Sequence, residues 1–215
     1  MIYKKEYIIE EYNSSAKSLE EHQKVKWGSR ESMMNRFSLA MERFDFGKPM
    51  EWLDVGCGTG AFQEFAQGRF PTLRGLAIDL NPTLLGHARE KNIRNIDFRE
   101  QDFLELEGHQ FDLITCFGVL QKSNFSLEQF FVHARRLLKA EGCVLADTKH
   151  LDWNKFLEPN FTPEPIHNWF TVKDIRQAIN KSGLIEKEVS GFQPEKYEIV
   201  DPCEAHTLIC IARNL

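Results

Sequence analysis

Short apolar runs alternate along this chain with longer stretches in which apolar residues recur every three or four positions. The apolar runs predict buried strands at 51–55, 73–80, 96–98, 111–116, 143–147, 185–189 and 207–212. The periodic stretches predict helices over 32–44, 61–67, 82–91, 126–138 and 172–181. Strands that alternate with helices are typical of a parallel sheet covered by helices on both faces, so we expect a seven-stranded α/β fold.

Polar residues and glycines at the boundaries support two of these helices. Ser126 followed by Gln129 is typical of a capping box, in which side chains satisfy free backbone groups at a helix start. Thr171, three residues before Asp174, has a similar arrangement. We expect the two helices to end at Gly142 and Gly183, because glycine is the commonest residue just beyond a helix.

The first predicted strand runs directly into a glycine-rich turn, Glu51 to Gly60 (EWLDVGCGTG). Glycine lacks a Cβ and readily adopts positive φ, so such a turn lets a ligand approach the backbone closely. The pattern is G-x-G-x-G with Asp54 at the strand end, whereas the dinucleotide fingerprint is G-x-G-x-x-G. The turn resembles motif I of the class I S-adenosylmethionine (SAM) methyltransferases. A strand-to-helix turn that binds no ligand is the alternative.

Later segments resemble the same family, in the same order. The second strand ends on an acid that can accept both ribose hydroxyls, a polar and aromatic turn follows the third strand where the family binds adenine, and the loop after the fourth strand lines the methionine half of the cofactor in the family. The resemblance implies SAM as cofactor and a Rossmann-like methyltransferase fold whose last strand is antiparallel. It also implies cofactor contacts from Asp54, Gly56, Cys57, Gly58, Gly60, Asp79, Leu80, Gln101, Asp102, Phe103, Phe117 and Gln121.

The segment before the first strand, residues 1–45, is expected by the same resemblance to form helices that cap the cofactor. In methyltransferases resembling the ubiquinone-pathway O-methyltransferase, an arginine at the distance of Arg36 from the glycine turn binds the methionine carboxylate, which a guanidinium fork fits well. We expect Arg36, ahead of Arg30, in this role, and Trp27 and Tyr12 closing over the cofactor. A solvated helix arginine and simple aromatic packing are the alternatives.

Composition favours one enzyme domain that acts on small molecules. A chain of 215 residues with 42% apolar content suits a single domain, 1–215. The 27 basic and 32 acidic residues give a net charge of −5 with no basic stripe, which disfavours a nucleic-acid partner. The five cysteines form no C-x-x-C pair, so no metal site and no disulfide is expected. No apolar run approaches the roughly 18 residues of a membrane span, so we expect a cytoplasmic protein; oligomeric state is left open.

The chemistry of methyl transfer directs attention to histidines near the carboxyl ends of the strands, where open α/β sheets bind ligands. A hydroxyl acceptor must lose its proton, and histidine is a common base near neutral pH. His150 and His206 are therefore the predicted catalytic residues, with His167 behind them. The aromatic and proline-rich segment 151–170 is predicted to be a lid over the acceptor, or alternatively a surface loop packed on the core.

The sequence therefore predicts SAM-dependent methyl transfer, by in-line displacement, to an oxygen or nitrogen of a small molecule. The absence of an N-P-P-Y or D-P-P-Y run after the fourth strand disfavours base-amine and glutamine-amide acceptors. Gln121 replaces the histidine often found in the ubiquinone-pathway group, so the sequence departs from that group's pattern in this loop. A SAM-binding protein without transfer, acting as a partner subunit or a rearrangement catalyst, and a nicotinamide-dependent oxidoreductase are the alternatives.

Overall fold

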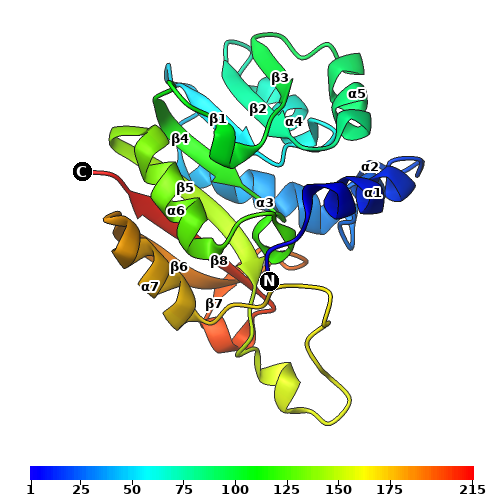
Figure 1. Ribbon diagram of the computed structural model, residues 1–215, viewed down its shortest axis with the longest axis vertical. Coiled ribbons are helices and arrows are strands. Elements are labelled where there is room, and N and C mark those ends of the chain that lie inside the picture. Colours follow the sequence, from blue (N-terminus) through cyan, green and yellow to red (C-terminus); the bar gives the residue numbers. More distant parts are fainter.

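The strands of the chain form one eight-stranded sheet in a computed structural model that describes all residues, 1–215. Five parallel strands come first: β1 (Trp52–Val55), β2 (Gly75–Asp79), β3 (Ile96–Glu100), β4 (Phe111–Cys116) and β5 (Leu138–Lys149). They are followed by β6 (Ile185–Gln193), β7 (Glu198–Val200) and β8 (Thr207–Arg213) in the order β3-β2-β1-β4-β5-β8-β6-β7. The last strand, β8, is antiparallel to both β5 and β6, which confirms the predicted topology (Figure 1).

The eighth strand, β7, was not predicted. It pairs antiparallel with the end of β6 and extends the sheet by one short edge strand. The turn between them contains Tyr197 in the left-handed region at φ 58°, a conformation with no strong sequence signal for tyrosine.

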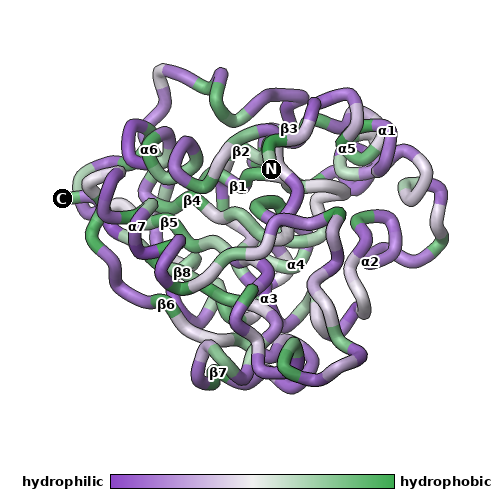
Figure 2. Tube along the Cα trace, turned by 60° about the horizontal axis from the view of Figure 1, so that its bottom comes forward, coloured by the Kyte–Doolittle hydropathy of each residue, from purple (hydrophilic) through white to green (hydrophobic).

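Helices cover both faces of the sheet, as expected. One core joins the sheet to α6 (Leu127–Leu137) and α7 (Val172–Ser182). A second core joins the opposite face to α3 (Arg30–Arg43) and α4 (Ala61–Arg69), and α5 (Pro82–Glu90) packs on that same face against β2. Hydrophobic residues concentrate in β4, β5 and β8, between helices whose outer sides are hydrophilic (Figure 2). No helix is both long and apolar enough to cross a bilayer.

The predicted helix ends hold with one exception. Both capping boxes form, at Ser126 with Gln129 and at Thr171 with Asp174, and Gly183 ends α7 in the left-handed region. Gly142 is not a helix end, because α6 stops at Leu137 and Gly142 lies inside β5. A Cβ on Gly142 would lie 2.8 Å from the carbonyl oxygen of Phe111, so glycine serves there to let β5 approach β4.

Two further helices precede α3: α1 (Lys5–Ser15) and the single turn α2 (Glu21–Lys24). They lie beside the sheet, between the half that holds β2 and β3 and the half that holds β6 and β7 (Figure 1). The connection from β5 to α7 contains only one short 3₁₀ turn, Asn154–Leu157, and projects away from the body of the molecule. A parallel bridge between His150 and Phe170 closes the base of this connection.

Candidate functional site

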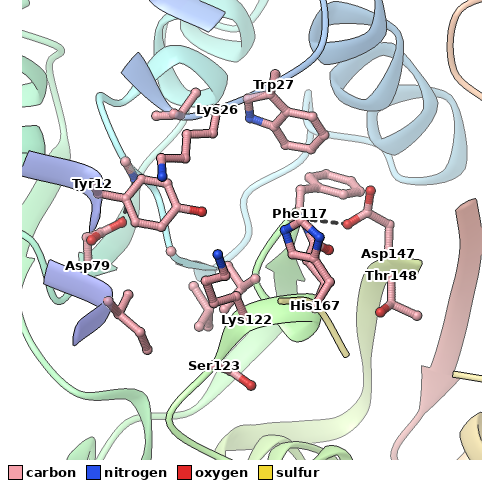
Figure 3. Close-up of a pocket in the computed structure, with 18 of the residues that line it drawn as sticks. Tyr12, Lys26, Trp27, Asp79, Phe117, Lys122, Ser123, Asp147, Thr148 and His167 are labelled. Atoms are coloured by element: carbon pink, nitrogen blue, oxygen red, sulfur yellow. Dashed lines mark hydrogen bonds between the residues drawn. The ribbon is translucent and has the colours of Figure 1, made fainter. Parts of the chain in front are cut away.

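A cavity of about 490 Å³ lies at the carboxyl ends of β1, β2, β4 and β5, where the sheet topology places ligand sites. Tyr12 and Asp79 lie on one side of it and Asp147 and Thr148 on the other, with Lys122 and His167 between them (Figure 3). The predicted site residues that line it are Trp27, Arg36, Gly56, Gly58, Asp79, Leu80, Gln101, Phe103, Phe117, Gln121 and His206, together with Tyr12 and His167.

The glycine turn follows β1 and forms one wall of the cavity. Gly56 has φ 74°, and a Cβ added there would lie 2.2 Å from Cγ2 of Val119. Gly58 has φ 55°, and its Cβ would lie 2.7 Å from Cγ1 of Val25. Both positions therefore need glycine for conformation and for close packing. At Gly58 the space is occupied by Val25, which lies in the segment between α2 and α3. The N-terminal capping segment therefore packs directly on the glycine turn.

Asp79, at the end of β2, fixes the glycine turn from the neighbouring strand. Its Oδ2 accepts from the Gly58 backbone N–H at 2.8 Å, and its Oδ1 accepts from the Asn81 N–H at 2.8 Å. A carboxylate has about four lone-pair sites, so each oxygen retains capacity to accept a ligand hydroxyl. Burial raises the pKa of Asp79, and the backbone donors oppose that shift.

Asp54 is buried behind the glycine turn and does not line the cavity itself. It accepts from the Thr115 hydroxyl at 2.6 Å and from the Gln63 side-chain amide at 2.7 Å. Burial raises the pKa of Asp54 to about 7 despite these donors. Its side chain thus connects β1 to β4 and α4 beneath the glycine turn.

The turn after β3 contributes unequally to the cavity. Gln101 and Phe103 line it, whereas Asp102 does not. The Asp102 carboxylate accepts from the Leu104 backbone N–H and from Asn124, and it pairs with Lys5 of α1 at 2.5 Å. It therefore acts here as a cap and as an attachment point for α1, which corrects the expectation that it faces a cofactor.

Two other predicted cofactor residues also lie off this cavity. Cys57 is buried beside Ala77 and Leu85, and burial raises the pKa of its thiol well above the ordinary range. Gly60 is the left-handed residue that precedes α4, with Phe98 and Ala88 next to it. Both shape the glycine turn through packing.

Arg36 lines the cavity but already has a buried partner. Its Nε donates to Asp147 Oδ2 at 2.6 Å, and Nη1 donates to the carbonyl and hydroxyl of Ser32. The Trp27 ring stacks on the guanidinium at 4.3 Å, and Asp147 Oδ1 accepts from the Gly118 N–H at 2.6 Å. Arg36 is thus not a solvated helix arginine; it joins α3 to β5 and to the loop after β4.

Ion pairs that were not predicted from the sequence join α1 to two lysines that line the cavity. Glu11 of α1 accepts from the buried Lys122 at 2.7 Å through both carboxylate oxygens, and from Lys26 at 2.6 Å. Tyr12, next in α1, lies near Asp79, and burial followed by that carboxylate raises its pKa. The partners of Glu11 are 15 and 111 residues away in sequence, so no local pattern signals them.

A second charged group lies at the β5 and β8 side of the cavity. Lys149 donates to His206 Nε2 at 3.4 Å, and its ammonium is 3.6 Å from Glu164 Oε2. That same oxygen is 2.6 Å from His167 Nδ1. Burial, then the charge of Lys149, lowers the pKa of His206 to about 4 and lowers the pKa of His167, so both imidazoles are neutral at physiological pH. Burial also lowers the pKa of Lys149.

The structure separates the two histidines predicted to be catalytic. His206 lines the cavity, with its ring between those of Trp153 and Trp169. His150 does not line it: the side chain is 1% exposed, and Nδ1 lies 3.3 Å from the Ala205 carbonyl. Asp147, Thr148 and Lys149 all line the cavity, so this wall ends one residue before His150. His150 is therefore misplaced for proton abstraction in the cavity.

The segment 151–170 contacts the cavity through polar residues, not through its rings. Glu164 and His167 line the cavity, whereas Trp153, Phe156, Phe161 and Trp169 pack on one another and on His206. The Asn168 N–H donates to the Gln121 carbonyl at 2.7 Å, which anchors the segment to the loop after β4. The rings thus support the wall from outside and leave its inner surface charged.

A glycine turn and an acid that meet at the ends of the first two strands define an α/β protein built to hold a nucleoside cofactor. Comparison with known proteins agrees: residues 53–142 match the family model described as "Methyltransferase domain". The chain is 30% identical over 156 residues to a ubiquinone biosynthesis O-methyltransferase of Acinetobacter baumannii, covering 65% of each protein. It is also 30% identical over 115 residues to a malonyl-[acyl-carrier protein] O-methyltransferase of Acetivibrio thermocellus, covering 53% of this chain and 39% of that one.

Solved structures give the same result for the fold. The magnesium protoporphyrin IX methyltransferase of Synechocystis superposes with a TM-score of 0.71 at 14% identity, covering 99% of this chain and 100% of that one. Residues 53–142 therefore contain a methyltransferase domain, and the chain has the fold of the class I SAM-dependent methyltransferases. It spans less than two thirds of the length of the curated relatives it matches.

Proposed function

We propose that this protein transfers a methyl group from SAM to an oxygen or nitrogen of a small-molecule acceptor. The observation that carries the proposal is that one cavity connects the glycine turn and Asp79 with Lys149 and His206 on the far side. Its volume of about 490 Å³ falls within the range of roughly 300–1,000 Å³ typical of small-ligand sites. The curated relatives, named as O-methyltransferases, favour oxygen as the accepting atom.

The residues at the β1 and β2 ends fit the nucleoside part of SAM. Gly56 and Gly58 leave the backbone open, Asp79 retains acceptor sites for ribose hydroxyls, and Gln101 and Phe103 line the expected adenine position. When bound, SAM supplies a methyl group on a positively charged sulfur, which needs no covalent enzyme intermediate. The chain's own task is therefore to orient the acceptor in line with that methyl group and to exclude water.

Arg36 can take part in binding the methionine carboxylate only as a secondary donor. Four of its five N–H groups have partners in Asp147, Ser32 and Thr207, which leaves one N–H to donate toward the cavity. Its charge is also balanced by Asp147 at 2.6 Å. We therefore assign to Arg36 mainly the positioning of Asp147 and of the Gly118 backbone beside the reacting centre.

A hydroxyl acceptor would require a base, and two neutral histidines face the cavity. His206 has its Nε2 occupied by Lys149, whereas His167 lies beside Glu164, which can hold a positive charge that develops on the imidazole. His206→Ala and His167→Ala should both leave cofactor affinity unchanged. If a histidine is the base, only its own substitution should lower turnover by about a hundredfold or more.

Calorimetry and a transfer assay test the proposal in two stages. S-adenosylhomocysteine (SAH), the demethylated product, should bind to the purified protein, and NADH, the matched control, should not. SAM labelled in its methyl group is then incubated with a panel of small hydroxyl, carboxyl and amine compounds, and labelled products are counted. SAH binding without transfer to any compound would favour a cofactor-binding protein that does not methylate; NADH binding without SAH binding would favour an oxidoreductase.

A further inference from the structure

The cations that line the cavity differ in how closely each is paired with a carboxylate. Arg36 lies 2.6 Å from Asp147, whereas Lys122 and Lys26 share Glu11, at 2.7 Å and 2.6 Å. Arg36 and Lys122 are nearly buried, with side chains 8% and 4% exposed, and Lys26 is 35% exposed. Each of these three cations therefore has a carboxylate oxygen within 2.7 Å.

Lys149, the fourth cation that lines the cavity, has no carboxylate this close. Its nearest carboxylate oxygen, on Glu164, is 3.6 Å away and lies closer to His167 Nδ1, at 2.6 Å. Its one hydrogen bond, to His206, is long at 3.4 Å, although an ammonium has three N–H groups to donate. The Lys149 side chain is only 17% exposed, so water replaces few of the missing partners. Burying an ammonium with few partners is costly, so a ligand anion that reached Lys149 would be bound by a strong charge-assisted hydrogen bond.

Glu164 has the features of a partner that can be displaced. Its side chain is 58% exposed, and it lies on the irregular connection between β5 and α7, which no sheet or long helix holds in place. An exposed ion pair at this distance contributes little, under about 1 kcal/mol. A ligand carboxylate that reached Lys149 directly would therefore gain more than the Glu164 contact loses.

The position of Lys149 assigns this anion to the acceptor and not to the cofactor. Lys149 ends β5, and β4 separates β5 from β1, whose glycine turn forms the cofactor half. Neighbouring strands are about 4.8 Å apart, so Lys149 lies roughly 10 Å across the sheet from that turn. The Trp169 ring lies 4.8 Å from the Lys149 ammonium and holds it in place beside His206.

We propose that the acceptor of this protein carries a carboxylate, which Lys149 binds by displacing Glu164 from the cavity wall. This inference rests on the proposed methyltransferase function and specifies its substrate class. It makes Lys149 a residue that determines specificity. In the absence of the acceptor, Glu164 occupies the position that the acceptor's anionic group takes beside Lys149. Removing each side chain should therefore change the affinity for a carboxylate in opposite directions.

Nuclear magnetic resonance titrations with benzoate, and with benzamide as its uncharged counterpart, test the inference on the full chain. Both probes are added to the protein with and without saturating SAH, whose own binding is measured first by calorimetry. Benzoate should bind at least about tenfold more tightly than benzamide in the wild-type protein, because a charge-assisted contact is gained. Equal affinities would overturn the inference, whereas a lack of SAH binding would count against the methyltransferase function alone.

Three variants test whether Lys149 and Glu164 determine the preference for benzoate over benzamide. Lys149→Met should abolish the preference for benzoate, and Glu164→Gln should strengthen benzoate binding about twofold to fivefold by removing the competing carboxylate. Glu195→Gln is the matched control, because Glu195 lines the same cavity without pairing to a cation. A preference that survives Lys149→Met, or a Glu164→Gln variant that binds benzoate no better than Glu195→Gln does, would contradict the proposal. If Lys149→Met does not fold, the opposite effect of Glu164→Gln still decides it.

Discussion

Replacing Asp79 by asparagine tests the cofactor half of the cavity with the smallest change in shape. Both carboxylate oxygens already accept one backbone N–H each, from Gly58 and Asn81, at 2.8 Å. The remaining lone pairs are the acceptors that we assign to the two ribose hydroxyls of the cofactor. Asparagine keeps one acceptor oxygen but places an NH₂ group against one of the two backbone donors.

The expected loss of SAH affinity follows from the number of hydrogen bonds that the substitution weakens or removes. Hydrogen bonds to a charged group contribute about 1.5–3 kcal/mol each, against about 1 kcal/mol for neutral pairs. Two ribose contacts that weaken or disappear should cost about 3 kcal/mol of binding free energy, or roughly 150-fold in the dissociation constant for SAH. The misplaced amide should in addition destabilise the glycine turn by about 1–2 kcal/mol.

Isothermal titration calorimetry with SAH measures the first quantity, and urea unfolding without ligand measures the second. Asp97→Asn is the matched control, since Asp97 lies on the neighbouring strand β3, pairs only with Arg99 and is about half exposed. That variant should bind SAH as the wild type does. If Asp79→Asn bound SAH within twofold of the wild type while folding normally, the assignment of the cofactor to this turn would be wrong.

Three further predictions concern buried groups around the site. Because the pKa of Asp54 is raised to about 7 in the folded state, its contribution to stability is full below about pH 4 and is lost as pH rises through 7. Urea unfolding should therefore show that the wild type loses up to about 4 kcal/mol of stability between pH 4 and pH 8, relative to Asp54→Asn. Gly56→Ala should cost at least about 2 kcal/mol, since its Cβ would meet Val119, and Val119→Ala should recover part of that loss in the same assay. Asp147→Asn should cost about 3–5 kcal/mol in thermal unfolding, because it leaves the Arg36 guanidinium buried without a counter-charge.

Local patterns in the sequence were sufficient to predict most of the scaffold. The alternation of apolar runs and periodic stretches reflects strands buried between two helical layers, which require apolar residues on both faces. The capping boxes at Ser126 and Thr171 depend on residues only three positions apart, so they could be identified directly. Gly142 shows the limit of such local patterns: its role depends on the distance to Phe111 in a different strand.

The wall of the cavity could be predicted only in part, for the same reason. The glycine turn and Asp79 follow from a strand end and its next neighbour, where local sequence and fold topology are enough. The pairs Arg36–Asp147 and Glu11–Lys122 each join residues 111 positions apart, and neither partner has a local pattern that indicates the other. The expectation for His150 failed because its ring is buried beside the Ala205 carbonyl, and these two residues are 55 positions apart, so no local pattern indicates the contact.

The two halves of the cavity differ in what determines them: the fold determines the proposed cofactor half, and individual side chains determine the proposed acceptor half. Members of one fold family share strand ends, so we assign the part of the ligand that stays the same to residues on them, such as Gly56 and Asp79. Lys149 also ends a strand, but its partners Glu164 and His167 come from a connection whose length and composition the sheet does not constrain. Substitutions in that connection can alter the charge of the acceptor half without disturbing the cofactor half. We therefore expect the residues between β5 and α7 to decide which acceptor this protein selects.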